Sequence, residues 1–231
     1  MSTVLVTGAN KGIGLEFCRQ LSSRGAKVIA ACRHASEPLL GLPVEVVEGV
    51  EMTSDAACAQ LVEALHGVRI DWLVLNAGTY DSTSLGKLDF DRMRYEYDVD
   101  ALGPLRVTQA VLANLSAKAK IAIVSSRAGS IADNTSGGIY GYRMAKAALN
   151  MAGVSLAKDL AARGISVVML HPGMVDTDVL RSALGTLGSR AEISDAIAPS
   201  VAVHDMIQRI DELTLETSGR FLHRNGQVLP W

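Results

Sequence analysis

The feature that most constrains this chain is a short apolar run that leads into a glycine-rich turn. Residues 4–7 are apolar or β-branched and end at Gly8, a pattern that is typical of a buried strand. A helical pattern follows directly, with Ile13, Phe17 and Leu21 spaced so that they share one face. The chain therefore opens with a strand, a turn and a helix, the first unit of an α/β fold.

The glycines of this turn are Gly8, Gly12 and Gly14, in the spacing G-x-x-x-G-x-G. Because these positions carry no Cβ, the backbone can approach a ligand closely. The first turn of the helix also offers free N–H groups and a partial positive charge, which suit a pyrophosphate. The turn predicts a dinucleotide site, and a tight strand–helix corner without a ligand is the alternative.

The composition is typical of one α/β domain. Of the 231 residues, 48% are apolar, enough to cover both faces of a parallel sheet. The net charge of −2 offers no basic surface to a nucleic acid. No apolar run reaches the ~20 residues that a membrane span needs. Residues 1–3 lead straight into the first strand, so we expect no signal peptide and a cytoplasmic location.

The cysteines and histidines argue against disulfides and metals. The three cysteines are odd in number and have no C-x-x-C spacing, so we expect them to be reduced and in the core. The five histidines include no H-x-x-x-H pair, and we expect no metal site. His171 follows an apolar run and is expected to be a structural residue at a strand end.

Apolar runs and helical patterns alternate along the whole chain. This alternation predicts a single α/β domain over residues 1–231, a doubly wound Rossmann-type parallel sheet of about seven strands with helices on both faces. The expected strands cover residues 4–7, 27–31, 44–47, 71–75, 120–124, 166–170 and 220–223. The longest helical patterns cover residues 89–115, 142–163 and 198–213, with a kink or restart at Pro104.

The end of the second expected strand bears on cofactor choice. Folds that select NAD usually have an acidic residue here for the ribose 2′-hydroxyl, but no acid occurs before Glu37. Arg33 could instead pair with a 2′-phosphate, and Lys11 in the glycine turn could add a second positive charge. These residues favour NADP(H). The alternative is that both cations are solvated surface charges.

Small and polar residues follow the fourth and fifth strands. Asn76, Ala77 and Gly78 end the fourth, where small side chains suit the close approach of a cofactor or merely tight packing. Ser126 follows the fifth strand, on the edge where ligands bind in doubly wound sheets. Its neighbour Ser125 stays open as an alternative to Ser126.

Tyr142 and Lys146 open a long helix and lie four residues apart, so they share a face. A phenol is a weak acid with a pKa near 10. A neighbouring ammonium lowers that pKa because it favours the phenolate. The pair therefore suits acid–base chemistry, while an amphipathic helix with a tyrosine beside a surface lysine is the alternative. Further on, residues 174–195 are expected to form a mobile substrate loop.

Together these motifs resemble the short-chain dehydrogenase/reductase family over essentially the full length. They are the glycine turn, Asn76-Ala77-Gly78, Ser126, Tyr142-x-x-x-Lys146 and Pro172-Gly173, which occur in the family's order. Within the family the chain is similar to the C-factor and sniffer-type carbonyl reductases. This second likeness rests on the long loop 129–138 and on the terminal Pro230-Trp231.

The resemblance implies roles for the site residues. Tyr142 would protonate the carbonyl oxygen in reduction or act as the base in oxidation, and Ser126 would donate a hydrogen bond to that oxygen. Lys146 would lower the pKa of Tyr142 and bind the nicotinamide ribose, and Thr177 would bind the carboxamide. The full set implied to bind NADP(H) is Gly8, Asn10, Lys11, Gly12, Ile13, Gly14, Arg33, Glu51, Met52, Asn76, Ala77, Gly78, Tyr142, Lys146, Pro172, Gly173, Val175 and Thr177.

The chain departs from the family pattern at two places. The family's fourth catalytic position is an asparagine in a V-N-x-x-G stretch, and here it is Asp100. An ionised Asp100 near Lys146 would favour the phenol form of Tyr142, so we expect a more alkaline rate profile than in an Asp100→Asn variant. Ser126 also lies sixteen residues before Tyr142, a longer spacing than is usual in the family.

The sequence therefore predicts an NADPH-dependent oxidoreductase that reduces a ketone or aldehyde, with a small carbonyl or alcohol as its substrate partner. The alternative is a cofactor-binding, catalytically weak protein with a signalling or regulatory role. An epimerase or a methyltransferase fits the glycine spacing and the missing acid less well. The family commonly assembles through helices equivalent to residues 99–115 and 142–163, which implies a homodimer or homotetramer. The substrate would be chosen by Tyr80 and by residues 133–140 and 174–188.

Overall fold

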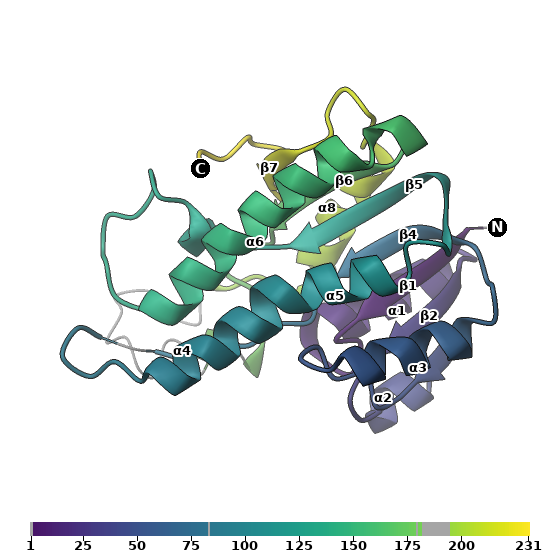
Figure 1. The fold of residues 1–231 in the computed structure, drawn as a ribbon, viewed down its shortest axis with the longest axis horizontal. Coiled ribbons are helices and arrows are strands. Elements are labelled where there is room, and N and C mark those ends of the chain that lie inside the picture. Colours follow the sequence, from purple (N-terminus) through teal and green to yellow (C-terminus); the bar gives the residue numbers. More distant parts are fainter. Residues whose placement is uncertain (1, 83, 179, 182–194) are drawn as a thin grey trace.

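A computed structural model describes residues 2–82, 84–178, 180–181 and 195–231 of the chain. Its centre is a parallel sheet in the order β3-β2-β1-β4-β5-β6-β7 (Figure 1). Each strand pairs in parallel with its neighbours. The strands are β1 Thr3–Thr7, β2 Lys27–Ala31, β3 Glu45–Val47, β4 Ile70–Leu75, β5 Leu115–Val124, β6 Ser166–His171 and β7 Arg220–His223. The predicted fold class is thereby confirmed.

Helices cover both faces of this sheet (Figure 1). One face packs against apolar side chains of α3, α5 and α6, and the other against those of α1, α2 and α8. The α-helices are α1 Gly12–Ser23, α2 Glu37–Leu40, α3 Asp55–Leu65, α4 Phe90–Tyr97, α5 Gly103–Ala110, α6 Tyr140–Asp159 and α8 Pro199–Asp211. Short turns are η1 Asp98–Leu102, η2 Arg127–Gly129 and η3 Ala161–Arg163. In the described part of the chain, every helix is too short or too polar to cross a membrane.

The strand order reverses between β1 and β4. From β1 the chain moves outward through β2 to β3, and it then returns to β4 on the other side of β1. In such a sheet, the loops beyond the carboxyl ends of the two central strands diverge and leave a crevice for a ligand. The register sets Val6 beside both Ala30 and Val74, so these strands end at a common level.

The helix predicted over residues 89–115 is divided into three parts. α4 leads into η1, a single π-helical turn, and α5 then begins with Pro104 in its first turn, where a missing N–H costs nothing. The restart expected at Pro104 is therefore confirmed. The prediction of helix up to Leu115 was wrong, because Leu115 already pairs with Ile70 as the first residue of β5.

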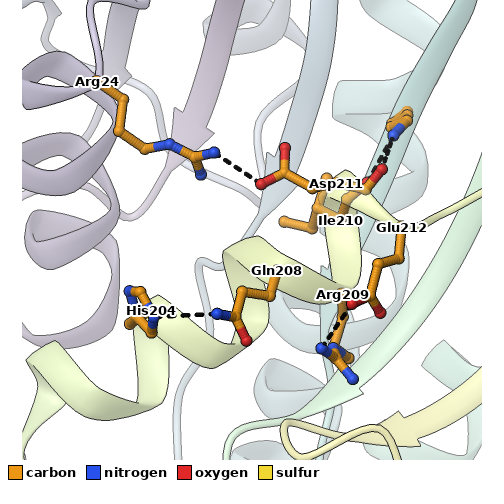
Figure 2. Close-up of polar contacts among 8 residues, drawn as sticks. Arg24, His204, Gln208, Arg209, Ile210, Asp211 and Glu212 are labelled. Atoms are coloured by element: carbon orange, nitrogen blue, oxygen red, sulfur yellow. Dashed lines mark hydrogen bonds and ion pairs between the residues drawn. The ribbon is translucent and has the colours of Figure 1, made fainter.

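Helix α8 is fixed to the sheet at its C-terminal end. Lys120 of β5 donates from Nζ to the main-chain carbonyls of Ile210 and Asp211, at 2.7 and 2.8 Å. The Ile210 carbonyl also accepts from the N–H of Leu213 at 3.2 Å, and the ammonium caps both carbonyls and opposes the negative end of the helix dipole. Arg24 adds an ion pair to the Asp211 carboxylate at 2.7 Å (Figure 2). Both contacts lie at the amino edge of the sheet, away from the crevice.

Candidate active site

A cleft of about 950 Å³ opens at the carboxyl edge of the sheet. Its wall is built from the β1–α1 turn, the end of β2, the loops after β4, β5 and β6, and the first turns of α6. Every residue predicted for catalysis or cofactor binding lines this cleft except Gly14 and Asp100, whereas of residues 133–140, predicted to choose the substrate, Ile139 alone lines it. Both exceptions lie behind the wall, and both contact residues that line it.

The glycine turn is shaped by close contacts that allow no side chains. Gly8 has φ +65°, and a Cβ there would lie 2.7 Å from the Cα of Ala77. A Cβ on Gly14 would overlap the carbonyl of Gly8 and lie 2.5 Å from Nδ2 of Asn76. Asn76 donates from that nitrogen to the carbonyls of Thr7 and Gly8, at 3.1 and 3.2 Å. The end of β4 therefore holds the turn that presents the N-terminus of α1 to the cleft.

The two cations predicted to bind a phosphate both reach the cleft. The side chain of Lys11 is 62% exposed and its Nζ lies 3.2 Å from Oδ2 of Asp178. The side chain of Arg33 is 64% exposed and its Nη1 lies 3.6 Å from Oε2 of Glu51. Exposed ion pairs of this kind are weak, so both cations can exchange a carboxylate for a phosphate at little cost.

Tyr142 and Lys146 meet at the floor of the cleft. Both lie on α6, and Nζ of Lys146 is 5.6 Å from the centre of the Tyr142 ring. Lys146 is buried and donates to the carbonyl of Val124 at 3.4 Å. The ring of Tyr80 packs edge-on against Tyr142, with 5.1 Å between the ring centres. The predicted pair therefore shares one face, and that face is turned toward the cleft.

The two serines after β5 have different surroundings. Ser125 is buried, and its hydroxyl donates to Oδ1 of Asn150 at 2.6 Å. Ser126 lies at the cleft, and its side chain is near enough to Tyr142 to lower the pKa of the phenol. Its Oγ also accepts from the N–H of Ala128 at 3.2 Å. The geometry therefore favours Ser126 over Ser125 as the hydroxyl beside the reacting group.

Burial sets the acidity of Tyr142 in this structure. Loss of solvent is the largest cause, and it raises the pKa of the phenol above its ordinary value. Lys146 and the Ser126 hydrogen bond act in the expected direction and lower the pKa, while Asp100 and Glu96 raise it. The expectation that Lys146 lowers this pKa is met as one contribution, but burial outweighs it.

Asp100 is fully buried within the π-helical turn η1. Its Oδ2 lies 3.7 Å from Nζ of Lys146, and its Oδ1 accepts from the N–H of Thr79 at 2.7 Å. Burial raises the pKa of this carboxyl, and Lys146 and the Thr79 N–H oppose that rise. Asp100 therefore joins the loop after β4 to Lys146 by side-chain contacts.

Glu96 lies next to the site without lining the cleft, and it was not predicted from the sequence. It lies on α4, it is fully buried, and its Oε1 accepts from the N–H of Asp81 at 2.6 Å. Burial is the main reason that its pKa rises to about 7. One signal could have found it: Glu96 precedes Asp100 by four residues in a helical pattern, so both carboxyls fall on the same face.

The loop after β6 forms the last wall of the cleft. Gly173 has φ +82°, a conformation that favours glycine, and Thr177 packs its Cγ2 3.4 Å from where a Cβ on Gly12 would lie. Thr177 thereby faces the glycine turn across the cleft. His171 packs against His223 with 5.5 Å between ring centres, and burial lowers its pKa to about 3.

The mobile substrate loop predicted over residues 174–195 lies largely outside the described residues, which omit 179 and 182–194. Its described ends are tied together, since the N–H of Asp176 donates to the carbonyl of Ile197 at 2.9 Å. Within the described ranges, no group of three histidine, cysteine or acidic side chains is arranged to hold a metal ion.

Known proteins match this chain over the residues that line the cleft. The family model for short chain dehydrogenases matches residues 2–186. The 1-hydroxy-2-glutathionyl-2-methyl-3-butene dehydrogenase of Rhodococcus sp. (strain AD45) is 44% identical over 233 residues, and the match covers 100% of both proteins. C-signal of Myxococcus xanthus is 43% identical over 166 residues, which are 70% of this chain and 93% of that protein.

Solved structures share the fold over the full chain. The NADPH-bound carbonyl reductase from chicken fatty liver superposes with a TM-score of 0.86 at 30% identity and covers 100% of this chain and 99% of its own. The carbonyl reductase Sniffer of D. melanogaster superposes with a TM-score of 0.85 at 25% identity and covers 100% of both chains. The matched regions contain all the residues predicted for the site, from Gly8 to Thr177.

Proposed function

Because this chain belongs to the short-chain dehydrogenase family, as its motifs predicted, we propose that it is an NADP(H)-dependent oxidoreductase that interconverts a carbonyl compound and its alcohol. The observation that carries the proposal is the meeting of Tyr142, Lys146 and Ser126 at the floor of a cleft that the glycine turn also enters. Acid, cation and hydrogen-bond donor thus surround one small volume beside a dinucleotide-type turn.

In the proposed reaction, Tyr142 donates a proton to the carbonyl oxygen during reduction and takes it back during oxidation. A raised pKa suits the first task, since the phenol stays protonated at neutral pH. Ser126 would donate a hydrogen bond to the oxygen as negative charge develops on it. Lys146 would stabilise the phenolate that is left, and its own position is held by Val124 and Asp100.

The residues at the cleft fit a dinucleotide phosphate. Gly8 and Gly12 take positive φ values, the N-terminus of α1 has no side-chain cap, and two cations line the rim. Arg33 would pair with the 2′-phosphate and Lys11 would add positive charge nearby. When bound, the cofactor supplies or accepts the hydride. The carbonyl reductase from chicken fatty liver, a structural neighbour, binds NADPH.

The substrate is a ketone or aldehyde small enough to lie beside Tyr80 and Tyr142, or the matching alcohol. The Rhodococcus relative is named for an alcohol that carries a glutathionyl group, so such conjugates belong in a substrate panel. Assembly as a homodimer or homotetramer is part of the proposal. It would use α6, where the side chains of Met144 and Met151 are exposed.

The test is loss of NADPH absorbance with a panel of carbonyl compounds, with NADH run in parallel. Tyr142→Phe should lower kcat by on the order of 10²- to 10⁴-fold, because the proton donor is removed while the ring remains. Tyr97→Phe is the matched control, since it removes a hydroxyl from an exposed residue of α4 outside the cleft. A Tyr142→Phe variant with the wild-type rate would overturn the proposal.

A signalling or regulatory protein that binds the cofactor but turns over slowly is the second candidate. Two observations favour it: Asp100 places a carboxylate 3.7 Å from Lys146, and C-signal is a close relative. The same panel separates the two candidates. Tight NADPH binding without turnover of any carbonyl compound would support this second role.

A further inference from the structure

One buried carboxyl joins three parts of the active site. Oε1 of Glu96 accepts from the N–H of Asp81, in the loop after β4, at 2.6 Å. Oε2 of Glu96 occupies the space where a Cβ on Gly141 would lie, so a side chain at that position would overlap it. Glu96 itself is on α4 and fully buried. Its carboxyl therefore spans the gap between the β4 loop and the first turn of α6.

The two contacted residues are the immediate neighbours of the two tyrosines in the cleft. Asp81 follows Tyr80, and Gly141 precedes Tyr142. The tyrosine rings meet edge to face with 5.1 Å between their centres. A displacement at either backbone contact would therefore move one ring relative to the other.

We propose that Glu96 is a positioning residue of the active site: its carboxyl, seated against Gly141 and bonded to Asp81, fixes Tyr142 relative to Tyr80 and to the reacting oxygen. The inference rests on the proposed function, in which Tyr142 transfers the proton. It goes beyond that function because it assigns a role to a residue that does not line the cleft.

The charge state of Glu96 is part of this role. The groups that face it are Asp81 from the loop, Arg92 from its own helix, Asp100 from η1, and the phenols of Tyr80 and Tyr142. Arg92 is the one cation among them, and its Nε binds Asp81 at 3.0 Å. Among the residues that the structure describes, Oε2 of Glu96 has no hydrogen-bond partner, which disfavours the ionised form of a buried carboxyl.

Consequently, the carboxyl is neutral below a pH of about 7 and charged above it. The added negative charge raises the pKa of Tyr142, as Asp100 also does. Deprotonation of Tyr142, which alcohol oxidation requires, is therefore delayed to higher pH. Reduction is less affected, because it uses the protonated phenol.

The steric half of the proposal is tested by a double-mutant cycle on the full-length protein. Gly141→Ala should lower kcat by on the order of 10²-fold, since the new Cβ overlaps Glu96 and shifts the first turn of α6. In a Glu96→Ala background the overlap with the carboxyl is gone and the tight contact that remains is with Cγ of Met93, at 3.0 Å, so Gly141→Ala should cost much less than in the wild type. Losses that multiply in the double variant, or a Gly141→Ala variant with the wild-type kcat, would overturn the proposal.

The charge half is tested with Glu96→Gln, which keeps the size and an acceptor for Asp81 but cannot ionise. The ultraviolet absorbance titration of Tyr142, taken as the difference from a Tyr142→Phe background, should move to lower pH in Glu96→Gln. The alkaline limb of alcohol oxidation should move with it. The control is Glu63→Gln on α3, an exposed residue outside the cleft, which should leave both curves in place.

Because the titration needs no turnover, it tests the role of Glu96 separately from the proposed oxidoreductase function. A shifted titration in a protein that turns over no carbonyl compound would support Glu96 and contradict the proposed function. Titration curves of folded wild type and Glu96→Gln that coincide would overturn the role of Glu96, whatever the activity.

Discussion

Asp100 stands where the resemblance to short-chain dehydrogenases implies an asparagine. It replaces the amide of an asparagine by a carboxylate, and that carboxylate contacts both the buried Lys146 and the N–H of Thr79. A buried pair of opposite charges is costly to break from either side. The substitution therefore ties Lys146 to Asp100 and gives Tyr142 a negative neighbour that raises its pKa.

Replacing that carboxylate should change the pH dependence of the reaction. In Asp100→Asn, the negative charge near Tyr142 is gone, so the pKa of the phenol should fall. The rate profile for alcohol oxidation should then reach its plateau at lower pH than in the wild type. Measuring kcat against pH for both proteins decides the point, and two coincident curves would remove Asp100 from this role.

In the proposed function, Arg33 sets the choice between NADPH and NADH. Arg33→Asp should turn the preference toward NADH, because it replaces a 2′-phosphate partner by a group that suits a ribose hydroxyl. A charged hydrogen bond is worth about 1.5–3 kcal/mol, so kcat/KM for NADPH should fall roughly 10- to 100-fold. Arg19→Asp, an exposed α1 residue outside the cleft, is the matched charge control. An unchanged ratio of kcat/KM for the two cofactors in Arg33→Asp would contradict the assignment.

At the scale of single elements, the strands were the most predictable part. All seven strands that the structure describes were predicted, and the central ones stood out as short apolar runs because central parallel strands are buried on both faces. β5 is longer than the predicted residues 120–124 and begins at Leu115. The start of β5 is fixed by pairing with β4, since the N–H of Ile70 donates to the carbonyl of Asn114. The local sequence around Leu115 does not encode this pairing with a distant strand.

The division of residues 89–115 shows why an element can be predicted while its detail cannot. The apolar spacing runs through Val99 and Val107, so the pattern predicted helix on both sides of Pro104. The π-helical turn η1 between them buries Asp100 against Thr79 and Lys146. Those partners lie on β4's loop and on α6, and their distance from η1 depends on packing that the local sequence does not specify.

At the scale of the whole molecule, the cleft was predictable because its motifs all follow strands of one parallel sheet. The residues after β1, β4, β5 and β6 must meet at the carboxyl edge once the strand order is given. Tyr142 and Lys146 could be added because a helix places residues four apart on one face. Glu96 could not, since its contact with Gly141 depends on how α4 and α6 pack together.

The central claim is that this cleft passes a hydride between NADPH and a carbonyl carbon while Tyr142 passes the proton. The most direct measurement uses NADPH with deuterium at the transferring carbon, a carbonyl compound chosen from the panel, and mass spectrometry of the alcohol. The account predicts one deuterium on the carbinol carbon with the wild type and little or none with Tyr142→Phe. NADPH that binds the wild type but leaves every product unlabelled would contradict it.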